Sequence, residues 1–193
     1  MSQISFLEKF IISVYPLSPS ELDQFLAIWE PFSAKRKTIL TRAGDTERHL
    51  YFVTGGIQRV FYYDERDREA TIIFSYPPSF FGVADSFLTQ IPSRFFAETL
   101  TPSSFLKTSF NQLDELMKQH HNIERMIRIL TTGAFSGIME RLVEIQCYNA
   151  EDKFKTLLKR SPHLINLIPH KYIANYLGID PTNFSKLLSK WRL

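Results

Sequence analysis

The stretch that decides the fold is Ile168-Pro169-His170-Lys171-Tyr172-Ile173-Ala174-Asn175-Tyr176-Leu177-Gly178-Ile179-Asp180-Pro181-Thr182-Asn183-Phe184-Ser185-Lys186-Leu187-Leu188. Its spacing fits a helix-turn-helix that begins at His170. Ile173 and Leu177 stand one helical turn apart, and Ala174 is small where a second helix would cross. Gly178 occupies the tight turn, where a residue with positive φ is needed.

The second helix of this pair has its own start signal. Asp180 is placed to cap it, and Pro181 is suited to its first position. Ile179, Phe184 and Leu187 would form its inner face. A pair like this commonly places its second helix in the major groove of DNA. A plain structural hairpin of two helices needs similar spacing, so both interpretations remain open.

The residues expected to contact DNA lie at the start of the first helix and along the outer face of the second. They are His170, Lys171, Thr182, Asn183, Ser185, Lys186 and Lys190. Lys186 is long enough to reach guanine O6 and N7, and Thr182 can contact a thymine methyl group. For His170, a simple exposed histidine at a helix start is the alternative.

The charge distribution agrees with this placement. Residues 1–150 hold 15 Lys/Arg and 17 Asp/Glu, whereas residues 151–193 hold 8 Lys/Arg and 3 Asp/Glu. The excess of positive charge therefore gathers on the segment with the helix-turn-helix pattern, where phosphate contacts would need it.

The overall composition excludes several classes of protein. Hydrophobic residues make up 44% of the 193 positions and charged residues 22%, which is typical of a globular protein. A single cysteine, Cys147, excludes an internal disulfide framework. Glu8 and Lys9 interrupt the first apolar run, so we expect no signal peptide and a cytoplasmic location. Without a glycine-rich phosphate loop, metal-ligand spacing or nucleophile motif, we expect neither an enzyme nor a metal site.

The rest of the chain divides by its periodicity. Apolar residues on a helical period predict a helix over 4–14 and another after Ser18-Pro19-Ser20-Glu21. Short segments rich in β-branched and aromatic residues between 32 and 108 predict an antiparallel roll or barrel. A long amphipathic helix is predicted over 123–145, and Asn149 to Asp152 looks like a fresh cap.

This order of elements, together with four motifs, resembles the Crp/Fnr family of bacterial regulators. The motifs are Ala43-Gly44-Asp45, Leu50-Tyr51-Phe52-Val53, Gly55-Gly56-Ile57-Gln58-Arg59 and Phe80-Phe81-Gly82. The resemblance implies an α+β fold with an effector-sensing β-roll of the cyclic-nucleotide-binding type at 1–110. It further implies a connecting and dimerisation helix at 111–148 and a helix-turn-helix domain at 149–193. Because the chain stops at Leu193, we expect no C-terminal wing.

The same resemblance places an effector loop at Gly82, Val83, Ser93 and Arg94. In the family a glutamate directly after the glycine holds the ribose, and an arginine followed by a small hydroxyl residue holds the cyclic phosphate. Here Val83 replaces the glutamate, and Phe95 follows Arg94. Neither side chain supplies the missing hydrogen bond. We therefore expect a small-molecule effector other than an ordinarily bound cyclic nucleotide.

Two features around this loop have alternative interpretations. Arg94 is either an anion-binding residue or a surface residue paired with Asp85 or Glu98. A set of aromatic residues forms either the core of the roll, which we favour, or an apolar ligand pocket. The set is Phe74, Tyr76, Phe80, Phe81, Phe87, Phe95 and Phe96.

The function implied is a homodimeric transcription regulator that dimerises through the helix at 120–146 and binds double-stranded DNA. RNA polymerase is a candidate partner, and no membrane association is expected. The alternative is a ligand-binding or protein-interaction module that has lost DNA binding. Val83, Pro181 and the missing wing motivate that alternative.

Overall fold

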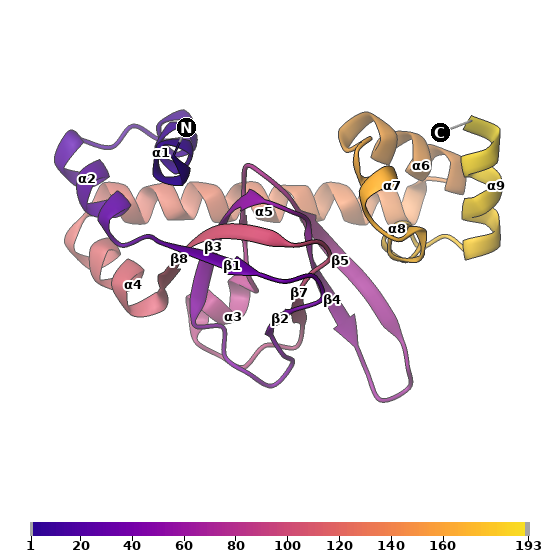
Figure 1. Cartoon of the computed structure of the whole chain (residues 1–193), viewed down its shortest axis with the longest axis horizontal. Coiled ribbons are helices and arrows are strands. Elements are labelled where there is room, and N and C mark those ends of the chain that lie inside the picture. The colour runs from indigo at the N-terminus through magenta and orange to yellow at the C-terminus, as the bar shows by residue number, and fades with distance from the viewer. Residues whose placement is uncertain (1, 192–193) are drawn as a thin grey trace.

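The computed structural model describes residues 2–191 and has the expected α+β architecture (Figure 1). A long helix, α5 (His121–Cys147), runs the length of the molecule. A β-roll lies against its middle, with α1, α2 and α4 at one end and α6 to α9 at the other. In the part of the chain that is described, no helix is both long and apolar enough to cross a bilayer.

The N-terminal end consists of α1 (Gln3–Val14), α2 (Pro19–Ala27) and α4 (Phe110–Gln119). The predicted cap of α2 is confirmed, since Ser18 and Glu21 form a reciprocal capping box. Leu7 and Phe25 are fully buried in one apolar cluster with Met126 of α5. This cluster fixes the first half of α5 against the roll.

The roll consists of two four-stranded sheets whose neighbouring strands are all antiparallel. One sheet has the order β1 (Glu30–Ala34), β8 (Ser103–Ser109), β3 (His49–Gly55) and β6 (Ser79–Phe81). The other has the order β2 (Ile39–Thr41), β7 (Phe96–Thr99), β4 (Gln58–Tyr63) and β5 (Glu69–Ser75). The charged stretch between the antiparallel strands β4 and β5 forms a hairpin tip, and β5 is an edge strand.

The helices that follow agree with the sequence pattern in most places. The helix predicted over 123–145 is α5, and the cap at Asn149 starts α6 (Ala150–Arg160). The helix-turn-helix is formed by α8 (His170–Leu177) and α9 (Pro181–Trp191). Two short helices were not predicted: α3 (Ala84–Thr89) after β6 and α7 (Leu164–Leu167) before α8.

The prediction that the aromatic set forms the core of the roll is wrong for several members. Phe81 is buried in the roll core, with Phe95 packed against it. Phe80 and Phe87 belong to the N-terminal cluster instead. Phe74 and Tyr76 pack against the core of the helix-turn-helix, and Phe96 stacks on Phe61. The second sheet therefore presents part of its aromatic surface to other parts of the chain.

Candidate nucleic-acid interface and effector loop

The turn between α8 and α9 has the geometry that the sequence predicts. Gly178 has φ +63°, a conformation that costs a residue with a Cβ atom. The Ile179 N–H donates to the Ala174 carbonyl at 2.9 Å, which closes the end of α8. Asp180 Oδ1 accepts from the Thr182 N–H at 2.8 Å and from the Asn183 N–H at 3.2 Å. The turn and the cap together fix the angle at which α9 leaves α8.

The inner face of α9 is held by aromatic packing. Phe184 is buried, and its ring meets the ring of Phe154 on α6 edge-to-face at 5.6 Å. The imidazole of His170 also meets the Phe184 ring edge-to-face, at 5.8 Å, and its Nε2 lies 3.1 Å from the Ile165 carbonyl oxygen. The ring of His170 therefore supports the helix pair, which is a role that neither sequence interpretation contained.

The predicted DNA-contact residues on α9 share one surface. Thr182, Asn183, Ser185 and Lys186 are all exposed. The Ser185 hydroxyl donates to the Pro181 carbonyl at 3.0 Å. Lys171 on α8 is also exposed, with its ammonium 4.8 Å from the centroid of the neighbouring Tyr172 ring. Among the described residues Lys186 forms no ion pair, and it lies in the middle of a helix whose outer face is exposed.

Lys190, also predicted to contact phosphate, already has a partner. Its Nζ lies 2.8 Å from Glu151 Oε2 in the first turn of α6. Lys155 contacts the other oxygen of Glu151 at 3.0 Å. Hydrogen bonds from the two lysines lower the pKa of the Glu151 carboxyl. Part of the positive charge counted for this segment is therefore already neutralised, which spacing within either helix could not reveal.

The predicted effector loop is closed by a residue that the sequence analysis did not identify. Gly82 has φ +136°, and Val83 is buried among roll-core residues. The buried carboxylate of Glu47 accepts from the Val83 N–H at 3.4 Å and from the His49 N–H at 3.2 Å. The Thr41 hydroxyl donates to it as well. A carboxylate thus already occupies the donors beside Gly82.

Burial raises the pKa of the Glu47 carboxyl, although four hydrogen bonds act in the opposite direction. Glu47 could not be recognised from the sequence, because a glutamate two positions before a strand usually faces solvent.

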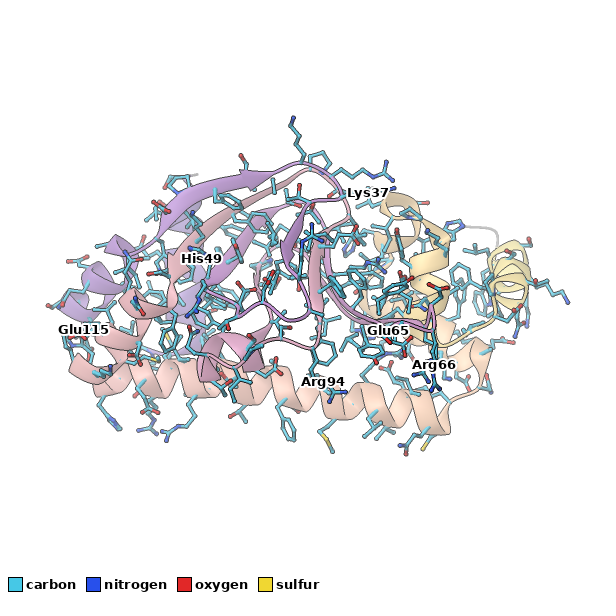
Figure 2. All side chains as sticks on the ribbon, turned by 90° about the horizontal axis from the view of Figure 1, so that it is seen from below. Lys37, His49, Glu65, Arg66, Arg94 and Glu115 are labelled. Atoms are coloured by element: carbon cyan, nitrogen blue, oxygen red, sulfur yellow. The ribbon has the colours of Figure 1, made fainter. Side chains whose placement is uncertain are left out.

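The remaining predicted effector-loop residues differ in their surroundings. Ser93 is buried and exchanges local hydrogen bonds with the Phe95 backbone. Arg94 is exposed at the surface of the roll, well away from His49 (Figure 2). Among residues 2–191 Arg94 forms no ion pair, so the pairing with Asp85 or Glu98 is wrong. Glu98 instead accepts from Arg59 Nε at 2.9 Å.

The second half of α5 carries an unusual apolar surface. Phe135 is 62% exposed, and Ile138, Leu142 and Ile145 are between 45% and 48% exposed. Their spacing of three, four and three residues is that of a coiled-coil seam. Isolated exposed apolar residues are common, but four on one helical stripe indicate an interface.

Comparison with known proteins agrees with this geometry. The cyclic nucleotide-binding domain family matches residues 31–120. The anaerobic regulatory protein of Pasteurella multocida is 25% identical, over 91% of this chain and 68% of that protein. Its counterpart in Haemophilus influenzae is 24% identical, over 92% and 73%. The chain is similar to these two regulators along most of its length.

Solved structures of other proteins show the same fold. FixK2 from Bradyrhizobium japonicum has a TM-score of 0.76 at 18% identity, covering 86% of this chain and 85% of that one. A Crp/Fnr-family transcriptional regulator from Eubacterium rectale has a TM-score of 0.71 at 17% identity, covering 91% and 84%. The fold is therefore shared with these proteins along most of the chain.

Proposed function

We propose that the chain is a homodimeric transcription regulator that binds DNA through α9. The observation that carries the proposal is the exposed heptad stripe Phe135, Ile138, Leu142 and Ile145 on the helix that leads into the helix-turn-helix. We assign effector sensing to residues 1–110, dimerisation to 111–148 and DNA binding to 149–193. The names of the relatives, anaerobic regulatory protein and transcriptional regulator, support the same class.

The dimer follows from the stripe. Two copies of α5 packed in parallel around a two-fold axis would bury the stripe against itself. Each helix would then carry its own α8–α9 pair at the same end. Two recognition helices about 34 Å apart would match successive major grooves of a near-palindromic site. RNA polymerase remains a candidate further partner of such a complex.

The effector proposed for the roll is a small molecule other than an ordinarily bound cyclic nucleotide. A cyclic phosphate placed against Gly82 would compete with the Glu47 carboxylate for the Val83 N–H. It would also meet the negative charge of Glu47 wherever that group is ionised. Gly82, Val83, Ser93 and Arg94 remain the proposed surroundings of the effector.

The test is selection of bound duplexes from a random DNA pool, followed by fluorescence anisotropy at two salt concentrations. The wild type should enrich a two-fold motif and bind it more weakly at higher salt. Lys186→Ala should weaken binding or relax selectivity at one position of each half-site. Lys9→Ala removes an exposed lysine of α1, at the opposite end of the molecule, and should change neither.

Failure of the wild type to enrich any motif, even at low salt, would contradict the proposal. Equal effects of Lys186→Ala and Lys9→Ala would contradict the assignment of α9 as the recognition helix.

A further inference from the structure

The first helix of the pair, α8, also contacts the roll through its polar side chains. Asn175 Nδ2 donates to the Glu69 carbonyl at 2.6 Å, and Asn175 Oδ1 accepts from the Thr71 N–H at 2.6 Å. Both backbone groups belong to β5, the edge strand of its sheet. The side-chain amide thus forms hydrogen bonds with a backbone C=O and a backbone N–H of the edge strand, as one peptide group of an added strand would. An amide can do this because it offers a donor and an acceptor together.

A second contact lies one turn earlier on α8. The guanidinium carbon of Arg59 on β4 lies 4.0 Å from the centroid of the Tyr172 ring and 3.9 Å from that of Phe61. Arg59 is only 3% exposed and also donates to Glu98 and to Glu69. Cation–aromatic contacts gain strength when they are desolvated. Tyr172 therefore closes a neutralised arginine site that belongs to the roll.

The roll and the helical end, α6 to α9, also share one buried apolar cluster. Ile57 and Leu100 of the roll belong to the same buried cluster as Phe154 and Leu177 of the helical end. The helical end is also tied to α5. Arg141 of α5 donates to the Tyr176 carbonyl of α8 and pairs with Glu144 at 2.7 Å. Figure 2 shows Glu65 and Arg66, which mark the tip of the β4–β5 hairpin, at the end of the molecule that carries α6 to α9.

We propose that Asn175 and Tyr172 are positioning residues that fix the recognition helix relative to the roll by docking α8 on the β4–β5 hairpin. We call this set of contacts, made by Arg59, Glu69 and Thr71 with Tyr172 and Asn175, the hairpin contact. This proposal rests on the proposed function, because the hairpin contact would set the distance between the two recognition helices of the dimer and so the half-site spacing that the dimer binds. With the hairpin contact formed, the helix pair is held by polar contacts to the roll in addition to the shared apolar cluster and the junction with α5. Without it, the cluster and the junction remain, but the polar contacts that set the position of α8 on β5 are lost.

The first experiment measures the position of α9 without DNA. Spin labels are placed at Lys35→Cys beside β1 and Ser189→Cys on α9, in a Cys147→Ser background. Both label sites are exposed. Labelled chains are diluted with unlabelled chains, so that only the distance within one chain is measured. The distribution should be narrow for the parent protein and clearly broader for Asn175→Ala and for Tyr172→Leu.

Asn166→Ala is the matched control, since Asn166 is an exposed asparagine of the same helical unit. It should leave the distribution narrow. Asn175→Asp covers the case in which the alanine variant folds poorly, because it keeps the shape and the acceptor but loses the donor to Glu69. Equally narrow distributions for the parent and for all the hairpin-contact variants would overturn the proposal.

The second experiment measures binding to palindromes whose half-sites are separated by a series of spacers. The wild type and Asn166→Ala should prefer one spacing, whereas Asn175→Ala should lose several-fold at that spacing and accept neighbouring ones. A variant that is merely less stable would bind less without a change in the preferred spacing. Broadened distances with an unchanged spacing profile would overturn the positioning role. A wild type that binds no duplex, while the distances still broaden in the variants, would contradict the proposed function but support the docking.

Discussion

Lys190 Nζ lies 2.8 Å from Glu151 Oε2, so the last turn of the recognition helix is tied to the first turn of α6. The pair is exposed to solvent on the lysine side and adds little stability by itself. Its effect on DNA binding is larger in principle, because it occupies a cation that could otherwise meet phosphate.

Glu151→Gln should strengthen DNA binding and make it more dependent on salt. The change removes a negative charge and releases Lys190, so one further phosphate contact would steepen the slope of log K against log salt by about 0.9. Anisotropy titration over a salt series measures this slope. Asp152→Asn removes the same charge from the neighbouring residue, which contacts Asn149 rather than α9. An equal change of slope in both variants would show that the loss of one negative charge, and not the release of Lys190, causes the effect.

Glu98→Gln should lower the free energy of unfolding by about 3 kcal/mol, because it leaves the buried Arg59 guanidinium without one of its two anions. Urea denaturation followed by circular dichroism measures this value. Glu30→Gln is the comparison, since Glu30 pairs with Lys107 but its side chain is 69% exposed. Its effect should be far smaller. Similar losses in the two variants would contradict the importance of burial.

The stability of the roll should depend on pH through Glu47. Burial raises the pKa of this carboxyl in the folded state, so the folded protein holds a proton that the unfolded chain releases at its ordinary value of 4.5. The contribution to stability is present below that value and is lost as pH rises through the raised folded pKa. Glu47→Gln should flatten this part of the curve of unfolding free energy against pH. An unchanged curve would show that other groups cause the dependence.

Leu142→Asp should convert the proposed dimer to a monomer, because it would place two unpaired carboxylates in the seam. Sedimentation equilibrium measures the molecular mass, and binding to a palindrome should fall toward the level of a single half-site. Ser136→Asp adds the same charge to an exposed position of α5 away from the heptad stripe and should leave the dimer intact. A dimeric Leu142→Asp variant would exclude this seam.

Two glycines without close neighbours should respond in opposite directions to alanine. Gly178→Ala should cost about 1–2 kcal/mol, since the backbone there has φ +63° and no atom lies within 4 Å of the added Cβ. Gly133→Ala, in the interior of α5 and equally unobstructed, should stabilise by up to about 1 kcal/mol. Thermal unfolding of both variants measures the difference in sign. A loss of stability at both positions would indicate that the methyl group added at Gly133 is crowded by the partner helix in the dimer.

The elements that depend on local signals could be predicted from the sequence. The capping box at Ser18, the turn at Gly178 and the cap at Asp180 each depend on residues within a few positions of one another. The long helix was equally clear, because its apolar period extends over many turns.

The contacts between distant segments could not be predicted. Tyr172 and Asn175 look like ordinary polar positions of a short helix, and only the fold brings β5 within 2.6 Å of the amide. Glu47 likewise gains its role from Thr41 and Val83, which lie on other strands or loops. A single sequence carries no signal for such pairs when each partner suits its local surroundings.

The contacts between the helical end and the roll limit which segments of this protein can be transferred to another protein. A transplanted segment 149–193 would carry Tyr172 and Asn175 to a host without an arginine site or an open strand edge to receive them. Exchanging such segments between relatives would therefore create chimaeras that succeed only when β4 and β5 travel with the graft. For the same reason, a change in a strand far from any base pair can alter which operators the regulator accepts, so selection acting on DNA recognition would also act on the hairpin.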